Sequence, residues 1–275
     1  MKTQSYNSYD SFKKKSEKHW LKNESLNSIF WEFSKNNLSR SESDWMGNVF
    51  KNHEIKNSAL ISKSSYLFLS TGLLTGACQV AKYLYRKKLM VKGVFGPTMV
   101  VDSFLQEWER LTARVSSSFT KRFYIFESLP KNYPSGIETS LVKATEKEWP
   151  RVWLWAKAFA MESLPQLDVH KSIQMAKNMQ KNGRLYLLKD KEGQTKGMGG
   201  FGRSTPNALV VNMIYINPDD RGKGLGQDLV GKLIHSSCSK GYSRILLFSE
   251  FIQPNNFYRR MGLQEKGMIV EKTLS

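Results

Sequence analysis

A six-residue segment in the second half of the chain combines three glycines with two cations. It reads Arg221-Gly222-Lys223-Gly224-Leu225-Gly226 and lies between an apolar, β-prone run and a run with helical spacing. The N-terminus of a helix presents unpaired N–H donors, and it carries about half a positive charge. Glycines let the backbone come close to a ligand because no Cβ intervenes. Pyrophosphate suits such a segment, and we call residues 221–226 the glycine loop.

Two other phosphate-binding motifs do not fit the glycine loop. A Walker loop needs Lys and Ser or Thr directly after its last glycine, whereas Gly226 is followed by Gln227-Asp228. The dinucleotide fingerprint needs the spacing G-x-G-x-x-G, whereas the glycines here alternate with single residues. Taken alone, the three glycines are also compatible with a plain turn.

With the strand before it and Asn255-Asn256-Phe257-Tyr258 after it, the loop resembles the cofactor motif of the GNAT superfamily of acyl-CoA N-acyltransferases. That family's loop reads Gln/Arg-x-x-Gly-x-Gly/Ala, and Arg221, Gly224 and Gly226 match it. The family also carries an Asn three residues before a Tyr, and then a Gly and an apolar residue. Asn255, Tyr258, Gly262 and Leu263 fit this second pattern. The resemblance covers roughly residues 136–275.

The resemblance implies a fold, a cosubstrate and several roles. The fold is α+β, with a mixed central β-sheet flanked by helices, and acetyl-CoA is the usual acyl donor. Backbone groups near Ile214 and Ile216 would hydrogen-bond the pantetheine arm of coenzyme A. Tyr258 resembles the family's general acid, which protonates the leaving thiolate. Asn255 would either bind the cofactor arm or cap the short helix.

The general base is less well determined by the sequence. Glu250 follows an apolar strand at the sheet end that faces the cofactor, and Glu162 lies late in a helix of the kind that walls the acceptor pocket in this family. Either carboxylate is also compatible with a solvated or salt-bridged role. No spacing of metal ligands is present. We expect an N-acetyltransferase that acts by direct attack of a small-molecule or peptide amine; the alternative is a non-catalytic acyl-CoA sensor.

The elements that would position these residues follow from the periodicity of the second half. Strands are expected at 141–144, 184–188, 196–203, 208–216, 244–248 and 268–271, and helices at 148–163, 169–181, 227–240 and 255–261. This order is typical of an α+β fold with helices on both sides of a mixed sheet.

The first half repeats part of this order. Helices are expected at 26–38, 77–85 and 98–113, and strands within 58–71, 89–97 and 122–126. The run Val94-Phe95-Gly96-Pro97 before an amphipathic helix resembles the N-terminal half of tandem GNAT proteins, in which one copy has decayed. Gly72 and Gly76 precede the helix without a basic neighbour, so we expect no tight cofactor binding there. An unrelated α+β helper domain remains the alternative. The predicted domains are 1–135 and 136–275, joined by a linker at 131–136.

Composition limits the classes of partner. The formal net charge of +18 makes nucleic acid the first partner to consider. The densest basic run is only Lys13-Lys14-Lys15, so we expect no nucleic-acid partner and a basic surface that favours an anionic ligand. The charge-free stretch 64–80 is short and polar for a membrane span. Two cysteines and a polar N-terminus without an apolar core favour a reducing, cytoplasmic location. The chain is expected to be a monomer or a homodimer.

Overall fold

A computed structural model describes residues 1–35, 43–113, 116–128, 137–163, 166–250 and 256–274. The chain divides into two compact units, which are Met1–Ile125 together with Lys266–Ser275, and Phe126–Glu265. This division differs from the expected one at 135/136, because the C-terminal segment belongs to the first unit. The linker expected at 131–136 lies outside the described residues.

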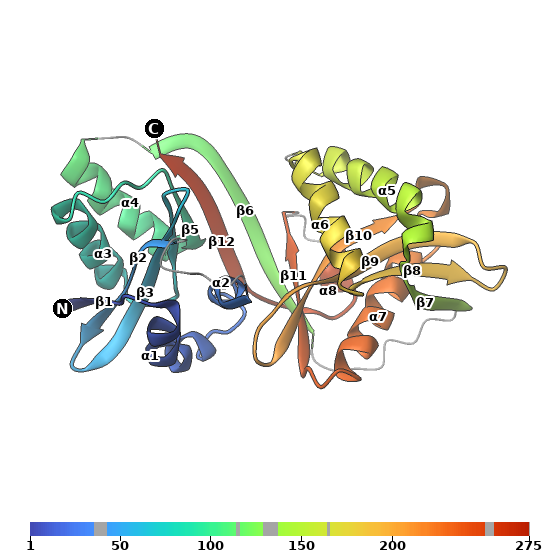
Figure 1. Ribbon diagram of the computed structural model, residues 1–275, viewed down its shortest axis with the longest axis horizontal. Helices are drawn as coiled ribbons and strands as arrows, with labels where there is room; N and C mark the ends of the chain where they lie inside the picture. Colours follow the sequence, from blue (N-terminus) through green and yellow to red (C-terminus); the bar gives the residue numbers. More distant parts are fainter. Residues whose placement is uncertain (36–42, 114–115, 129–136, 164–165, 251–255, 275) are drawn as a thin grey trace. The chain divides into compact units, whose positions relative to one another are not determined.

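The two halves of the chain have the same order of elements (Figure 1). The first half comprises β1 (Lys2–Ser5), α1 (Tyr9–Leu21), α2 (Phe30–Lys35), β2 (Ser43–Lys51), β3 (Glu54–Ser62), β4 (Tyr66–Leu69), α3 (Leu74–Arg86), β5 (Gly93–Pro97), α4 (Thr98–Thr112) and β6 (Ser116–Ser128). The second comprises β7 (Thr139–Lys143), the 3-10 turn η1 (Glu146–Glu148), α5 (Trp149–Glu162), α6 (Val169–Lys181), β8 (Leu185–Asp190), β9 (Thr195–Ser204), β10 (Ala208–Ile216), the turn η2 (Pro218–Asp220), α7 (Leu225–Cys238), β11 (Arg244–Ser249), α8 (Phe257–Arg260) and β12 (Gln264–Leu274). Apart from the two 3-10 turns, each half runs strand, two helices, three strands, helix, strand, helix, strand.

The last strand of each half contributes to the other unit. In the first unit the strand order is β1-β2-β3-β4-β5-β12, and β12 pairs antiparallel with β5 from Ile269↔Pro97 to Thr273↔Gly93. In the second unit the order is β6-β11-β10-β9-β8-β7, and residues 126–128 of β6 belong to that unit. Most of β12 thus belongs to the first unit, and the boundary falls within β6, at 125/126.

In the first unit, strand β3 separates two layers of core. Ala59 and Ile61 face the core formed with α3 and α4, whereas Leu60 faces the aromatic core of α1 and α2. This alternation is expected of a strand that is covered on both faces. Helix α4 buries Val101, Phe104, Leu105 and Trp108, as its sequence spacing predicts.

The sequence interpretation did not include β1, α1 or β2. Helix α1 begins after Ser8, whose hydroxyl accepts from Ser11 N at 3.3 Å, and it buries Tyr9, Phe12 and Trp20. The lysines that lie between these apolar residues weaken the helical pattern in the sequence. The turn between β2 and β3 places Asn52 and His53 at positive φ, which Asn tolerates better than most residues. Within the range predicted as a helix at 26–38, α2 begins at Phe30 and extends to Lys35, and residues 36–38 lie outside the described ones.

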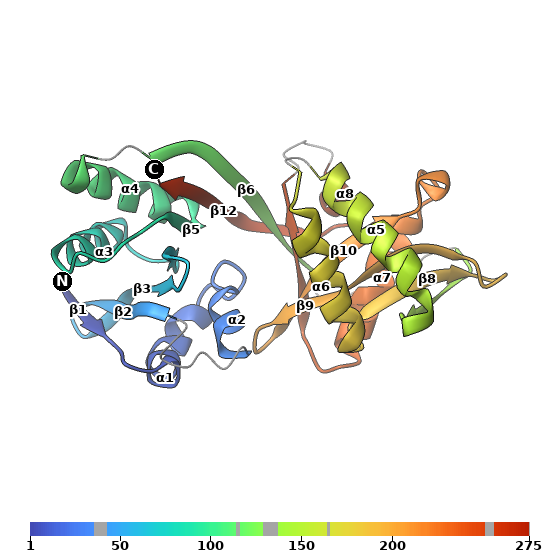
Figure 2. The same cartoon turned by 45° about the horizontal axis from the view of Figure 1, so that its top comes forward.

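In the second unit, helices α5 and α6 cover one face of the sheet and α7 covers the other (Figures 1 and 2). Leu185, Leu187 and Met198 join Val152 and Ala156 in the core under α5 and α6. On the opposite face, a Cβ added to Gly199 would lie 3.2 Å from Leu233 of α7, so that α7 packs closely against β9. Within the described ranges, no helix is long and apolar enough to cross a membrane.

Candidate functional site

Strands β10 and β11 separate from one another along their length. They pair in parallel from Ala208↔Arg244 to Val210↔Leu246, and residues 211–216 and 247–249 lie beyond the last pair that the structure describes. A bulge interrupts the ladder between β10 and β9 at the same point. There Met213 has φ +59°, and its N–H donates to Asn212 Oδ1 at 2.7 Å. Ile214 and Ile216, which the resemblance assigns to cofactor binding, lie in this part of β10 beyond the pairs with β11.

The glycine loop lies beyond the C-terminal end of β10, on the side where the two strands separate. Gly222 and Gly224 both have φ +78°, a conformation that favours glycine, and helix α7 begins at Leu225. A Cβ on Gly226 would lie 3.5 Å from the ring of Phe257 and 3.8 Å from Ile216. The start of α7, the end of β10 and helix α8 therefore meet at one place.

The two cations of the loop are paired with groups of the same unit. Arg221 Nη2 lies 2.7 Å from Glu162 Oε2, and its Nε donates to the carbonyl of Ile216 at 3.1 Å. Lys223 Nζ donates to the carbonyl of Asp219 at 2.9 Å and lies 3.2 Å from a carboxylate oxygen of Asp220. Both side chains are well exposed, so that neither pair is fixed by burial.

Tyr215 connects Glu162 to Arg221. Its hydroxyl donates to Glu162 Oε1 at 2.9 Å, and the guanidinium of Arg221 lies 5.2 Å from the centre of its ring. Burial, followed by the neighbouring carboxylate of Glu162, raises the pKa of Tyr215. The ring centre of Trp155 of α5 lies 5.8 Å from that of Tyr215. Tyr215 lies within an apolar strand sequence, so the sequence does not predict that it contacts Glu162 and Arg221.

Tyr258 lies in the short helix α8, next to the end of β6. Its ring centre is 5.6 Å from that of Phe126 and 5.3 Å from that of Phe257. Burial raises the pKa of Tyr258 to about 12. The phenol is therefore fully protonated at neutral pH, which is the state that a proton donor needs.

Of the remaining predicted residues, the structure places Glu250 directly after β11, with one carboxylate oxygen enclosed by protein. Asn255 lies outside the described residues. The cap of α8 is the next residue, Asn256, whose Oδ1 accepts from Tyr258 N at 2.8 Å and whose amide donates to Ser249 at 3.3 Å. This cap ties the start of α8 to the end of β11.

The first unit contains the counterpart of the glycine loop before α3, and its glycines serve packing. A Cβ on Gly72 would lie 2.4 Å from Asn57 Nδ2, and one on Gly76 would lie 1.8 Å from Asn57 Oδ1. The N–H of Thr71, in the same segment, donates to Asn27 Oδ1 at 2.8 Å. Asn57 and Asn27 thus pack against this segment of the first unit.

Comparison with known proteins agrees with this geometry. Residues 181–265 match the family model for the acetyltransferase (GNAT) domain. A sequence search of curated proteins finds no match. Three similar solved structures are a GNAT-family acetyltransferase from Colwellia psychrerythraea (13% identity, all of both chains covered, TM-score 0.57), a GCN5-related N-acetyltransferase from Sphaerobacter thermophilus (11% identity, 99% of this chain and 95% of that one, TM-score 0.61) and a tandem GNAT protein from the clavulanic acid biosynthesis pathway (10% identity, 99% and 97%, TM-score 0.51). At these identities the solved structures speak for the fold alone.

Proposed function

We propose that the chain belongs to the GNAT superfamily, whose domain model matches residues 181–265, and that its second unit is an N-acetyltransferase that transfers an acetyl group from acetyl-CoA to a primary amine. One observation carries the proposal. The glycine loop and the N-terminus of α7 follow the C-terminal end of β10, where β10 has separated from its parallel neighbour β11. The first feature suits pyrophosphate and the second suits an extended amide chain.

Several groups of the chain would hold the cosubstrate. The N–H groups of the glycine loop and the start of α7 face the phosphates, and backbone groups near Ile214 and Ile216 pair with the pantetheine amides. Arg221 reaches the phosphates only by giving up Glu162, and Lys223 by giving up Asp220. The first exchange is cheap, because exposed ion pairs contribute about 0–1 kcal/mol. In the second, the buried carboxylate of Asp220 keeps Lys196 at 3.6 Å.

Acetyl-CoA supplies the acyl group as a thioester. The amine nitrogen forms a bond to the thioester carbon, the carbon–sulfur bond breaks, and sulfur leaves with the bonding electrons. Glu250 or Glu162 takes the proton that the amine loses, directly or through water. Tyr258 donates its phenolic proton towards the leaving sulfur.

The raised pKa of Tyr258 sets a condition on this last step. A thiol has a reference pKa of about 8.5, so full transfer from a phenol of pKa about 12 is uphill by about 3.5 units, or about 5 kcal/mol. Tyr258 therefore acts first as a hydrogen-bond donor to sulfur. Complete transfer requires that the bound cosubstrate lowers the pKa of Tyr258. Otherwise the base must pass the proton that it took from the amine to the leaving sulfur.

We assign the first unit, Met1–Ile125 with Lys266–Ser275, the role of a GNAT-like unit without a working cofactor site, since Asn57 and Asn27 fill its counterpart loop. The acceptor is a small-molecule or peptide amine, and the setting that we propose is cytoplasmic. The alternative, a non-catalytic acyl-CoA sensor, shares the cofactor site but lacks turnover.

Two measurements test the proposal. Calorimetry with coenzyme A should show binding to the full chain and strong loss for Gly224→Asp, because that change adds a carboxylate where pyrophosphate must lie. A panel of amines with acetyl-CoA, read by release of free thiol, should show turnover. Binding without turnover on any amine would favour the sensor; no binding would refute both functions.

A further inference from the structure

In the free protein, the guanidinium of Arg221 occupies a site whose groups suit a cation. Its Nη2 lies 2.7 Å from Glu162 Oε2, its Cζ lies 5.2 Å from the centre of the Tyr215 ring, and its Nε donates to the carbonyl of Ile216 at 3.1 Å. A carboxylate and a carbonyl accept hydrogen bonds from a cation, and an aromatic face attracts it. We call these groups the Glu162–Tyr215 site.

The Glu162–Tyr215 site is fixed on one side and open on the other. The side chain of Tyr215 is buried, and its hydroxyl donates to Glu162 Oε1 at 2.9 Å. Burial, followed by the neighbouring carboxylate, raises the pKa of Tyr215, so its hydroxyl stays protonated and keeps this hydrogen bond at neutral pH. The side chain of Glu162 is 45% exposed, so a cation from solvent can reach the carboxylate.

Arg221 is a temporary occupant of this site if the second unit binds acetyl-CoA. In the proposed acetyltransferase the guanidinium turns to the phosphates, and Glu162 loses its ion pair with Arg221. The carboxylate keeps the neutral hydroxyl of Tyr215 as a partner. A negative charge beside an aromatic face attracts another cation once the first has left. Binding of the cosubstrate thus prepares the site for a second ligand.

The position of the site points to the acceptor as this second ligand. Glu162 is the last residue of α5, and Tyr215 lies in the part of β10 beyond the pairs with β11. The same segment of β10 is proposed to bind the pantetheine arm, so a cation in the site lies beside the arm that carries the acyl group. Its charge is not that of the reacting nitrogen, which must lose its proton to attack.

Resting on the proposed acetyltransferase, we infer that the acceptor is a primary amine with a second cationic group, which binds the Glu162–Tyr215 site after the phosphates have drawn Arg221 away. A guanidinium fits, because the site already holds one and its planar face stacks on aromatic rings. Glu162 then recognises this second charge, and Glu250 remains as the group that takes the proton of the amine.

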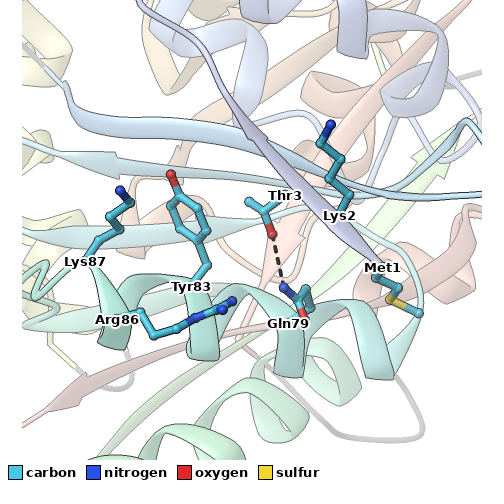
Figure 3. Close-up of a pocket in the computed structure, with 7 residues that line it drawn as sticks. All are labelled: Met1, Lys2, Thr3, Gln79, Tyr83, Arg86 and Lys87. Carbon is cyan, nitrogen blue, oxygen red and sulfur yellow. Dashed lines mark hydrogen bonds between the residues drawn. The ribbon is translucent and has the colours of Figure 1, made fainter.

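A cleft between β1 and α3 of the first unit has the opposite charge. It has a volume of about 480 Å³, and its charged side chains are Lys2, Arg86 and Lys87, of which Lys2 points away from α3 (Figure 3). None of the described residues that line it is acidic. A cationic acceptor would be repelled there, so the inference concerns the second unit.

The first test needs neither coenzyme A nor turnover. Its probe is agmatine, which carries a primary amine and a guanidinium at opposite ends of a butyl chain. Arg221→Ala empties the site, so agmatine should bind this full-length variant at least about threefold more tightly than it binds Lys223→Ala. Lys223→Ala is the matched control because it removes the same charge from the same loop, while Asp220 keeps Lys196 at 3.6 Å. NMR titrations at low ionic strength, where charge pairs are screened least, measure the affinities.

Adding Glu162→Gln to Arg221→Ala should abolish the gain, because it removes the carboxylate that binds the guanidinium. Equal affinity of Arg221→Ala and Lys223→Ala for agmatine would overturn the inference, as would a gain that survives Glu162→Gln. The three substituted side chains are well exposed, so the fold does not depend on them.

The second test compares two acceptors in turnover with acetyl-CoA. KM should be lower for agmatine than for n-butylamine, which lacks the guanidinium, and the ratio of the two values should rise at least about threefold in Glu162→Gln. An equal fall in kcat for both amines with an unchanged ratio would make Glu162 the base and overturn the inference. Absence of turnover on every amine would refute the acetyltransferase itself, whereas the cation site stands or falls on the agmatine titration alone.

Discussion

Removing the carboxylate of Glu162 should strengthen coenzyme A binding. In the structure Glu162 holds Arg221 at 2.7 Å, and the cofactor phosphates must compete with it for the guanidinium. Glu162→Gln keeps the shape of the side chain and its hydrogen bond to Tyr215 while it removes the charge. The free protein then holds Arg221 less strongly, and the free energy released appears as cofactor affinity.

The magnitude follows from the exposure of the pair. The side chains of Arg221 and Glu162 are 46% and 45% exposed, which places them among surface ion pairs worth about 0.2–1 kcal/mol. Coenzyme A should therefore bind about 1.4- to 5-fold more tightly to Glu162→Gln. Arg221→Ala should weaken binding, because it removes a phosphate contact.

A double-mutant cycle separates this effect from general electrostatics. In the Arg221→Ala background, Glu162→Gln should leave the affinity for coenzyme A nearly unchanged, because the competition no longer exists. Asp219→Asn serves as a control, since it removes an exposed charge close to the loop without touching Arg221. The reasoning is wrong if Glu162→Gln weakens binding, or if it gives the same gain with and without Arg221. Calorimetry at two salt concentrations measures all four affinities.

Four further outcomes are expected. Tyr258→Phe should lower kcat about a hundredfold to ten-thousandfold and leave coenzyme A affinity nearly intact, in steady-state kinetics and calorimetry; a loss of affinity alone would make Tyr258 a binding residue. Between pH 10 and 12 the free energy of unfolding should fall by up to about 3 kcal/mol more for the unsubstituted chain than for Tyr258→Phe. The phenol ionises near pH 10 in the unfolded state and near pH 12 in the folded state, so the unfolded state loses its proton first. Equal pH dependence of the two proteins in urea titrations would contradict this. Gly224→Asp should abolish coenzyme A binding to the full chain, with no residual site in the first unit; a remaining molar equivalent in calorimetry would mean that both units bind. A fragment of residues 136–275 should fail to fold as an active unit, because it lacks β6 with Phe126; thiol release by that fragment at the full chain's rate would refute the importance of the exchanged strand.

The sequence predicts most single elements of this protein but not their pairing. Helix α4 and strand β10 match their predicted ranges closely, because each has a strong local period. The pairing of β12 with β5 could not be predicted, since nothing local in the sequence of β12 specifies which strand it joins. The same limit applies to β1, which is held by long-range pairing with β2, from Lys2↔Phe50 to Ser5↔Gly47.

For the candidate site, spacing places the glycine loop at the start of α7, but it does not give the direction of side chains. Arg221 matches the motif, yet the structure turns it to Glu162 and Tyr215. Such contacts join residues that are far apart in the sequence, and the long, flexible Arg side chain has several partners within reach. Asn255 and Asn256 are equally good caps by residue type, and only the structure assigns the cap to Asn256.

The two halves of the chain offer an internal comparison of what makes such a loop a site. Strands β4 and β5 are parallel, as are β10 and β11, and in each unit a helix follows the first strand of the pair. In the first unit β4 ends at Leu69, soon after its last pair, Phe68↔Phe95. In the second unit β10 continues for six residues past its last pair with β11, and a bulge in its ladder with β9 lies within that extension, at Met213. The difference lies less in the glycines, which both loops contain, than in the length and bulge of the preceding strand. Extra strand length beyond the ladder leaves backbone groups for an extended ligand, whereas in the first unit Asn57 packs against Gly72 and Gly76 and closes the loop.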